Sequence, residues 1–286
     1  MHYFGKFLDS SMSPDPLCAG HSQGYARAVI VDHTLGSVHT GLNICELGPG
    51  GTLDPHAHSF EEGFYILTGG VVVEINGEAY LLKAGDYGVV KVGALHAWRN
   101  IGTLPVRWLQ MHAPQPKAPG KERDTFFKKG AVAAKSANPL DVNDRRGNLL
   151  GHFDETMIPP VGQRTNVAAG LEGVFLKWMI DENFGSIHHR LLFIEYQPGV
   201  SIGLHDHTFE ESYFLLSGEV QGVLDGQTYL AKPGDVLWTA VGCVHSFANV
   251  GDKPVRWLET FAPIPPKENV FRFMGEWDKR AKELEG

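Results

Sequence analysis

One pattern of metal-binding side chains occurs twice in this sequence, and its second copy lies 149 residues after the first. Each copy has two histidines separated by one residue, a glutamate four positions after the second histidine, and a third histidine further along. The two sets are His56, His58, Glu62 and His96, and His205, His207, Glu211 and His245. Because the offset is the same at all four positions, the chain contains two copies of one module, each with a complete set of candidate ligands.

The repetition extends well beyond these residues. Residues 26–116 align with residues 175–265 without a gap, and about a third of the aligned positions are identical. A period of this length is too long for a solenoid, so it indicates two tandem domains. We therefore predict one domain over 1–146 and another over 147–286, joined by the polar segment 143–148.

The sequence within each copy is typical of short β-strands. Apolar runs flank Asn76-Gly77 in the first copy, and Asp225-Gly226 holds the same place in the second. Such dipeptides favour type I′ hairpin turns, because both central residues of that turn need positive φ. Many short strands between Gly and Pro turns predict a barrel or sandwich. Apolar spacing also predicts a C-terminal helix at 275–285, and we expect a shorter counterpart within 117–135.

The bulk composition is that of an ordinary globular protein. Hydrophobic residues make up 43% and charged residues 20% of the chain, and the net charge is −8 with three cysteines. No apolar run is long enough to span a bilayer, and neither a dense basic cluster nor a secretion signal is evident. We therefore expect a cytoplasmic protein whose partners include neither nucleic acid nor membrane.

The strand pattern explains how four ligands can meet. Alternate side chains of a strand point to the same face, so His56 and His58 can converge on one point inside a barrel. Glu62, after a short turn, and His96, from a later strand, would complete the set. Three imidazoles and a carboxylate suit a divalent transition metal such as Fe, Mn, Ni, Cu or Zn, and leave coordination places for substrate, water or dioxygen. We expect one such ion in each domain.

These residues and their spacing resemble the cupin superfamily. Its first motif, G-x5-HxH-x3,4-E-x6-G, begins at Gly50 and again at Gly199, and its second motif is matched at Gly85, Gly93, His96 and Asn100 and again at Gly234, Gly242, His245 and Asn249. The resemblance implies an all-β fold of two tandem cupin barrels, of the double-stranded β-helix or jelly-roll type, with a short C-terminal helix. It does not imply one reaction, because cupins include dioxygenases, decarboxylases, isomerases, hydrolases and storage proteins.

Two features narrow the reaction. Oxalate decarboxylases place an arginine three residues before the first motif histidine, whereas this chain has Leu53 and Ile202 there. A small diacid is therefore disfavoured, since an unpaired buried carboxylate costs several kcal/mol. Strand parity also predicts aromatic side chains that face inward near the ligands, namely Phe64, Trp98, Tyr213 and Phe247. They would hold a flat apolar substrate, or they simply fill the barrel core.

The hypothesis that fits best is a quercetinase-like dioxygenase that cleaves an enolic or phenolic small molecule. In it, Glu62 or Glu211 both binds the metal and accepts the proton of the substrate hydroxyl. Its expected partners are a small-molecule substrate and dioxygen, and self-association as a homo-oligomer stays open. The alternatives are a bicupin hydrolase resembling ureidoglycine aminohydrolases, an isomerase or sugar-modifying enzyme, and a non-catalytic cupin that binds a small molecule.

Positions that differ between the copies carry a further expectation. If the copies have diverged in role, the differing side chains should line the working pocket, and His112 against Phe261 is one such pair. Otherwise His112 and His189 match no motif, and we expect both at the surface.

Overall fold

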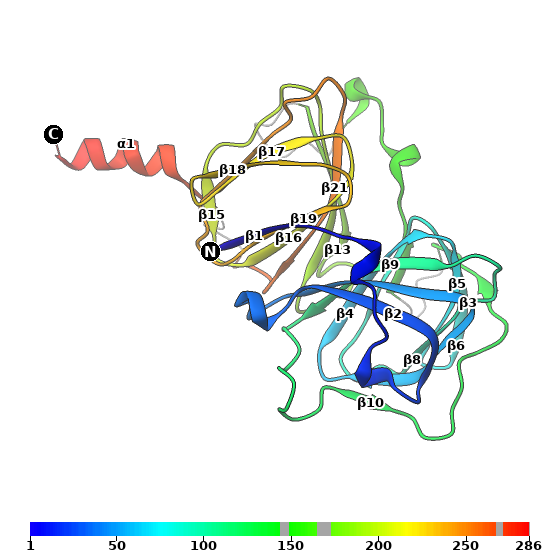
Figure 1. Cartoon of the computed structure of the whole chain (residues 1–286). Helices are drawn as coiled ribbons and strands as arrows, with labels where there is room; N and C mark the ends of the chain where they lie inside the picture. Colours follow the sequence, from blue (N-terminus) through cyan, green and yellow to red (C-terminus); the bar gives the residue numbers. More distant parts are fainter. Residues whose placement is uncertain (144–148, 165–172, 267–270, 286) are drawn as a thin grey trace. The chain divides into compact units, whose positions relative to one another are not determined.

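The computed structural model describes residues 1–143, 149–164, 173–266 and 271–285. Its strands form curled sheets in two compact units (Figure 1). The N-terminal unit comprises Leu8–Met157 and Met179–His189, and the C-terminal unit comprises Met1–Phe7, Ile158–Trp178 and Arg190–Gly286. The predicted domain boundary after residue 146, and most of the predicted linker, lie outside the described residues.

The N-terminal unit is one continuous sheet that curls into a barrel, with the order β11-β6-β5-β8-β3-β9-β4-β7-β12 and with β2 and β10 also paired to β3. Its long strand β3 serves both sides of the barrel, because residues 41–47 pair with β9 and residues 52–56 pair with β8. The strands are β2 Ser22–Val31, β3 Gly41–His58, β4 Glu61–Thr68, β5 Gly70–Ile75, β6 Glu78–Lys83, β7 Asp86–Val90, β8 His96–Arg99, β9 Val106–Ala113, β10 Thr125–Phe127, β11 Asn138–Pro139 and β12 Leu149–His152.

The C-terminal unit repeats this plan with the long strand interrupted. The two halves of β3 correspond to β14 and β15, which lie in separate sheets of order β1-β19-β16-β21-β14-β13 and β18-β17-β20-β15-β22. The elements are β1 His2–Lys6, β13 Val174–Ile180, β14 Arg190–Tyr196, β15 His205–His207, β16 Glu210–Ser217, β17 Val220–Leu224, β18 Gln227–Ala231, β19 Asp235–Thr239, β20 His245–Ala248, β21 Val255–Ala262, β22 Phe271–Phe273 and helix α1 Met274–Glu285. The predicted pair of jelly-roll barrels is confirmed.

The two predicted hairpins form as their turn residues require. Asn76 and Gly77 have φ of 52° and 89°, and Asp225 and Gly226 have φ of 46° and 79°. Both central residues of each turn are thus left-handed, and the turns join β5 to β6 and β17 to β18 in antiparallel register. The type I′ expectation is therefore confirmed in both copies.

The helix predictions had opposite outcomes. Helix α1 agrees with the predicted C-terminal helix, although none of its described side chains is buried. The helix expected within 117–135 is wrong, because that segment contains strand β10 and otherwise irregular backbone. Pro119, Gly120 and Gly130 disfavour a helix there. Strand β10 pairs instead with the end of β3, beside the first pair of ligand histidines.

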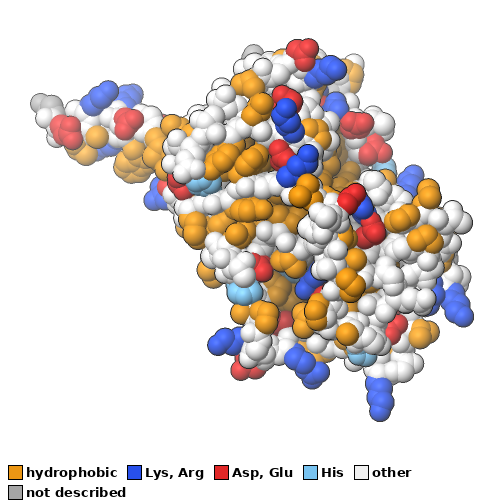
Figure 2. Space-filling view, in the orientation of Figure 1, with side chains coloured by type: hydrophobic (Ala, Val, Ile, Leu, Met, Phe, Trp, Pro, Cys, Tyr) orange, Lys and Arg blue, Asp and Glu red, His pale blue; other side chains and the backbone are white. Residues whose placement is uncertain are grey.

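The surface carries both signs of charge. Acidic and basic side chains are interspersed over the face shown in Figure 2. Apolar side chains are exposed on α1, where Trp277 is 60% and Leu284 71% exposed. No helix in the described part of the chain is long and apolar enough to cross a membrane.

Candidate metal centres

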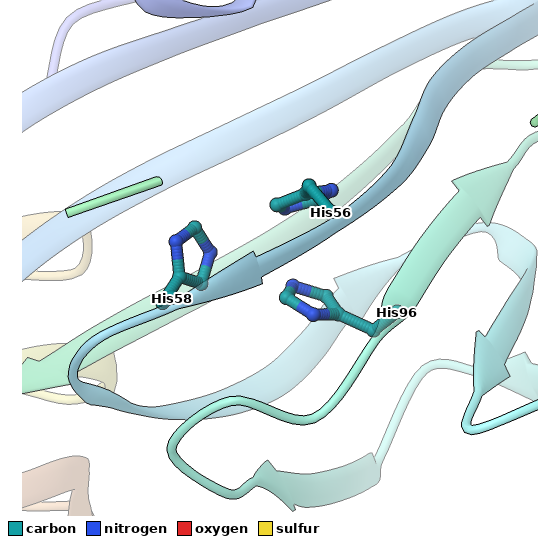
Figure 3. Close-up of side chains that lie close together, drawn as sticks. All are labelled: His56, His58 and His96. Atoms are coloured by element: carbon teal, nitrogen blue, oxygen red, sulfur yellow. The ribbon is translucent and has the colours of Figure 1, made fainter. Parts of the chain in front are cut away.

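Three imidazoles and one carboxylate converge inside the N-terminal barrel. His56 and His58 stand at the end of β3, and His96 begins β8 directly opposite His56. One nitrogen of each ring lies within 4.8 Å of the others, and Figure 3 shows the three rings grouped together. Oε2 of Glu62 lies 3.2 Å from Nε2 of His58 and 3.8 Å from Nε2 of His96. The four side chains of the first predicted ligand set therefore meet.

Each imidazole of this cluster is oriented by a hydrogen bond at its Nδ1. The partners are the carbonyl oxygen of Asp54 at 2.7 Å, the hydroxyl of Thr125 at 2.9 Å and the carbonyl oxygen of Ala94 at 3.2 Å. Since a carbonyl only accepts, Nδ1 of His56 and of His96 carries the proton and Nε2 keeps a lone pair that faces the cluster. A hydroxyl can donate or accept, and it would accept from Nδ1 of His58 when Nε2 binds a metal. No motif marked Thr125, which reaches the site because β10 pairs with β3.

The unpaired atoms of this cluster fit a metal ion. Nε2 of His58, Nε2 of His96 and Oε1 of Glu62 are buried and have no hydrogen-bond partner among the described residues. Burial lowers the pKa of His56 and His58, so both rings stay neutral. Burial would raise the pKa of Glu62, but its close contacts with His58 and His96 outweigh burial and hold that pKa well below its usual range. Neutral imidazoles and an ionised carboxylate are suitable donors for a divalent transition metal.

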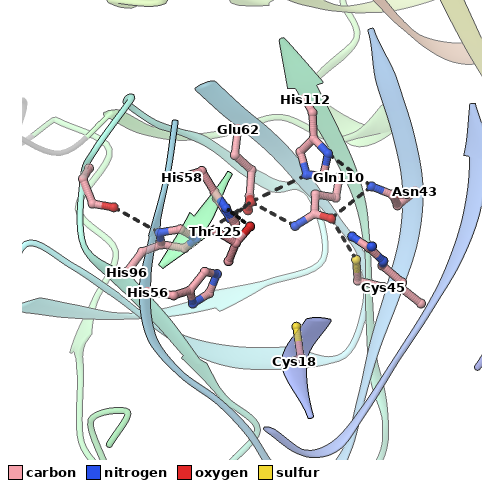
Figure 4. A network of polar contacts seen from close by, with 12 residues as sticks. Cys18, Asn43, Cys45, His56, His58, Glu62, His96, Gln110, His112 and Thr125 are labelled. Atoms are coloured by element: carbon pink, nitrogen blue, oxygen red, sulfur yellow. Dashed lines mark hydrogen bonds and ion pairs between the residues drawn. The ribbon is translucent and has the colours of Figure 1, made fainter. Parts of the chain in front are cut away.

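A polar network stands behind Glu62 (Figure 4). Gln110 donates from Nε2 to Oε2 of Glu62 at 2.9 Å, and its own Oε1 accepts from Asn43 at 3.2 Å and from the Cys45 thiol at 3.3 Å. His112 lies nearby, with Nε2 3.9 Å from Oε2 of Glu62, and is 5% exposed. The expectation that His112 is at the surface is therefore wrong. The alternation of side chains along β9 could have predicted the burial of His112, because residues 108, 110 and 112 share one face of the strand.

His189 is also buried, contrary to expectation. It is 1% exposed, and its Nδ1 lies 2.8 Å from Oε1 of Glu61. Glu61 also accepts a hydrogen bond from the Ser186 hydroxyl and from two backbone amides of the same loop. Burial alone would raise the pKa of Glu61, but the bonds from His189 and Ser186 lower it to about 2. These contacts fix the start of β4, next to Glu62, because a buried carboxylate needs such partners.

The C-terminal barrel holds the second ligand set in the same geometry. His205 and His207 lie in β15, and His245 begins β20 opposite His205. Their Nδ1 atoms bond the carbonyl oxygens of Gly203, Phe209 and Cys243 at 2.8, 2.9 and 2.9 Å. Oε2 of Glu211 lies 2.7 Å from Nε2 of His207 and 3.5 Å from Nε2 of His245. All three imidazoles are thus anchored at Nδ1 and turned toward one carboxylate, so this set also fits a divalent metal.

Tyr213 distinguishes the second centre from the first. Its hydroxyl donates to Oε2 of Glu211 and lies 3.3 Å from Nε2 of His245, whereas the equivalent residue in the first barrel is Phe64. Burial and the charge of Glu211 raise the pKa of Tyr213 well above its usual value, so the phenol stays protonated. Burial lowers the pKa of His205 to about 4. The second carboxylate is therefore held by a phenol in addition to the imidazoles.

A cavity of about 410 Å³ reaches the second centre at His205, Glu211 and His245. Its wall takes every other residue of the neighbouring strands, including Arg190, Leu192 and Ile194 of β14 and Trp257, Glu259 and Phe261 of β21. Alternation in a strand explains this spacing, since those side chains point to one face.

The four predicted substrate contacts fall into two pairs. Tyr213 and Phe247 line the cavity of the C-terminal unit. Phe64 and Trp98 are fully buried in the core of the N-terminal unit, where Trp98 stacks on Trp108 at 4.6 Å between ring centroids. Tyr213 and Phe247 are also buried in the core of their unit, so both pairs fill a barrel interior, and the second pair borders the cavity as well.

Glu259 is a buried acid that no motif marked. Its carboxyl lines the cavity and accepts a hydrogen bond from Trp257 Nε1 at 3.0 Å. Burial and the charge of Glu211 raise the pKa of Glu259 well above its usual value. The equivalent residue in the first barrel is Gln110, which has nearly the same shape and no charge. This difference between the two copies was the sequence feature that could have drawn attention to Glu259.

A family model described as "Cupin domain" matches residues 43–112 and 192–261, which repeats the 149-residue offset. Among named proteins, the chain is similar to the tetracenomycin polyketide synthase protein TcmJ of Streptomyces glaucescens, with 30% identity over 116 residues that cover 40% of this chain and 74% of TcmJ. It is also similar to quercetin 2,3-dioxygenase of Bacillus subtilis (strain 168), with 25% identity over 232 residues that cover 70% of this chain and 66% of that enzyme.

Solved structures support the fold. Salicylate 1,2-dioxygenase from Pseudoaminobacter salicylatoxidans in complex with gentisate has a TM-score of 0.71 at 15% identity, covering 96% of this chain and 86% of that one. Oxalate decarboxylase from Lactobacillus farciminis has a TM-score of 0.65 at 16% identity, covering 99% and 93%. At such identities the likeness concerns the fold alone. Together with the doubled family match, it shows that the chain belongs to the cupin family and carries two cupin domains.

Proposed function

We propose that this chain is a metal-dependent dioxygenase that cleaves an enolic or phenolic small molecule, and that the reaction takes place in the C-terminal unit. The observation that carries the proposal is the cavity of about 410 Å³ that joins an aromatic wall to the second set of ligands. Phe247, Trp257 and Phe261 give that wall flat apolar surfaces, which hold a flat molecule and exclude water. The similarity to a quercetin 2,3-dioxygenase supports the same class of reaction.

The residues of the second centre have distinct tasks. A divalent ion held by the three imidazoles and Glu211 would supply positive charge that favours the ionised form of a bound hydroxyl, with open places for dioxygen. Hydrogen bonds and charge from the neighbouring histidines keep Glu211 ionised in spite of its burial. Glu211 can therefore accept the proton that the substrate hydroxyl releases. Tyr213, bonded to Oε2 of Glu211, holds that carboxylate in place.

The N-terminal centre has the same ligands in closely packed surroundings. Phe64 and Trp98 are 0% exposed and belong to the hydrophobic core of this barrel. Gln110 and His112 occupy the side of Glu62 away from the three ligand histidines. We therefore assign a structural ion to this barrel, where metal binding adds to the free energy of folding.

Oxalate decarboxylation is not expected of either centre. Leu53 is 2% exposed within the N-terminal core, and Ile202 lines the apolar cavity of the C-terminal unit. Neither position offers a cation to a small diacid, whose unpaired carboxylate would cost several kcal/mol. Carbon dioxide release from oxalate at a rate typical of enzymes would contradict this assignment.

The direct test combines elemental analysis with an oxygen electrode. Protein purified without added metal should contain iron, copper, nickel or manganese, and metal-replete protein should consume oxygen with at least one member of a panel of flavonols, diketones and hydroxylated aromatics. The proposal fails if no member supports oxygen uptake. Turnover of a ureido or sugar substrate without oxygen would replace it with the hydrolase or isomerase alternative.

A further inference from the structure

The C-terminal unit contains a further cluster of metal-binding side chains, made of residues that neither histidine and glutamate centre uses. It consists of His2 in β1, Asp225 in the hairpin turn between β17 and β18, and Cys243 in the segment before β20. One donor atom of each side chain lies within 4.8 Å of the donor atoms of the other two. The fold thus brings an imidazole, a carboxylate and a thiol together from three distant parts of the sequence.

The contacts within this cluster turn its donors toward one another. Nδ1 of His2 lies 3.3 Å from Oδ2 of Asp225, and Nε2 of the same ring lies 2.9 Å from the hydroxyl of Tyr229. The amino group of Met1 lies 2.8 Å from the same carboxylate oxygen. Cys243 is buried, whereas the side chain of Asp225 is 34% exposed. The thiol therefore closes the inner side of the cluster, and the carboxylate leaves the outer side open to an ion from solvent.

The N-terminal copy has other residues at two of these positions. Asn76 and Ala94 are equivalent to Asp225 and Cys243. Asn76 still supports its hairpin, because its Oδ1 accepts a hydrogen bond from a backbone amide across the turn at 3.2 Å, as Oδ1 of Asp225 does at 3.1 Å. The turn therefore requires neither the negative charge of Asp225 nor the thiol of Cys243, and the structure of the hairpin does not explain why both donors are present.

We infer that His2, Asp225 and Cys243 form a third metal site, suited to a divalent ion that accepts sulfur as well as nitrogen and oxygen, such as Zn²⁺. Zinc binds thiolate sulfur at about 2.3 Å and imidazole nitrogen or carboxylate oxygen at about 2.0–2.2 Å, so the donors of a tetrahedral ion lie about 3.3–3.8 Å apart. The 3.3 Å between Nδ1 of His2 and Oδ2 of Asp225 already has this value. The ion would replace the amino group of Met1 as the cation beside the carboxylate.

A metal at this site has a structural role. It joins β1 to the hairpin turn and to the segment before β20, so its binding free energy adds to the stability of the C-terminal unit. Three protein donors leave a tetrahedral ion one place for water. The site lies outside the proposed reaction and does not depend on it.

Loading the metal-free, full-length protein with Co²⁺ tests this site by absorbance. Cobalt accepts the same donors as zinc, and a cobalt–thiolate bond absorbs strongly in the near ultraviolet. The two histidine and glutamate centres have no sulfur donor, so only the third site can give this band. Titration under argon with a phosphine reductant should show a third ion per chain and a thiolate band in the wild type. A wild type without the band overturns the inference.

Variants taken from the N-terminal copy assign the band to its donors. Cys243→Ala and Asp225→Asn introduce the residue types of that copy, so the hairpin should stay folded. Cys243→Ala should lose the band and the third ion and keep the other two. Asp225→Asn and His2→Ala should each weaken binding of the third ion at least about tenfold, because each removes a ligand. Cys18→Ala removes a different buried thiol and should leave the band unchanged.

The variants also supply outcomes that contradict the site. A band that survives in Cys243→Ala, or an affinity for the third ion that is unchanged in His2→Ala, overturns the inference. Retention of the other two ions in Cys243→Ala shows that the variant is folded. Since oxygen consumption is not measured, these outcomes are independent of whether the oxygenase proposal holds.

Discussion

The two barrels hold the same four ligands and differ in what surrounds them. In the N-terminal unit, Phe64 and Trp98 fill the interior, and the amide of Gln110 holds Glu62. In the C-terminal unit, a phenol contacts Glu211 and a cavity of about 410 Å³ reaches the ligands. A duplicated ligand set therefore does not imply a duplicated activity, because the residues of the wall decide whether an organic molecule can approach.

Some of the differences between the copies lie beside the ligands. Four substitutions at equivalent positions change the wall, namely Phe64 to Tyr213, Gln110 to Glu259, His112 to Phe261 and Gly41 to Arg190. The second member of each pair lines the cavity. Each pair therefore offers a matched experiment on the prediction that diverged positions line the working pocket.

Filling the cavity should have the largest effect. Leu192 lines the cavity. Leu192→Trp should lower kcat/KM for oxygen consumption by at least about 100-fold, because the larger side chain would occupy the substrate's volume while the metal ligands stay unchanged. The equivalent residue in the other barrel is Asn43, and Asn43→Leu should leave kcat/KM within about twofold. Metal content, measured by elemental analysis, should be unchanged in both. Full activity of a metal-replete Leu192→Trp protein would place the reaction elsewhere.

Exchanging the two residues beside the carboxylates should change stability in opposite directions. Gln110→Glu puts a second carboxyl at the 2.9 Å contact with Glu62, so it should cost on the order of 2 kcal/mol of unfolding free energy at neutral pH. Glu259→Gln removes a group whose folded pKa is raised. In the wild type that group contributes stability below its unfolded pKa of about 4.3, and the contribution is lost as pH rises toward the folded pKa.

The effect of Glu259→Gln on the unfolding free energy should change with pH. Relative to metal-free Glu259→Gln protein, the metal-free wild type should lose unfolding free energy between about pH 5 and about pH 8. The loss should be about 1.4 kcal/mol for each pH unit of this interval that lies between the unfolded and folded pKa of Glu259. Metal-free protein is used because a bound cation would lower the pKa of a nearby acid. A wild type that gains stability over this interval relative to the variant would show that Glu259 is ionised in the folded state.

Removing the side-chain support of one histidine should have the smallest effect. Thr125 accepts the hydrogen bond from Nδ1 of His58, whereas the second centre uses backbone carbonyls only. Thr125→Val should therefore weaken metal binding about tenfold at the N-terminal centre alone, as is typical when such a partner is lost. Competition with a chelator should show one weakened and one unchanged site per chain. Equal weakening of both sites, or of neither, would contradict this role.

The sequence predicted the parts of this molecule that follow from local rules. Asn76-Gly77 and Asp225-Gly226 specify their hairpins, and the repeated histidine and glutamate spacing places four side chains at each centre. The expected helix within 117–135 failed because β10 is stabilised by pairing with β3, a long-range contact that no local pattern encodes. His189 was missed for the same reason, since its ionic partner Glu61 lies 128 residues earlier in the chain.

The cavity was beyond sequence analysis for a different reason. Phe64 and Trp98 pack inward at positions equivalent to those of Tyr213 and Phe247, and the second pair lines the cavity of about 410 Å³. Strand parity predicts that a side chain faces inward, but the volume left over depends on how all the inward side chains pack together. The position of Arg190 and Glu259 in the wall of the cavity was therefore visible only in the structure.

The central claim is that the C-terminal centre performs the reaction and the N-terminal centre does not. Its most direct test measures bound metal and oxygen consumption in the single variants His58→Ala and His207→Ala, with a substrate identified by the oxygen-electrode panel. Each variant should lose metal from its own barrel only. Oxygen consumption should fall to background in His207→Ala and remain largely intact in His58→Ala. Unchanged metal content, or activity that survives in His207→Ala and disappears in His58→Ala, would contradict the account.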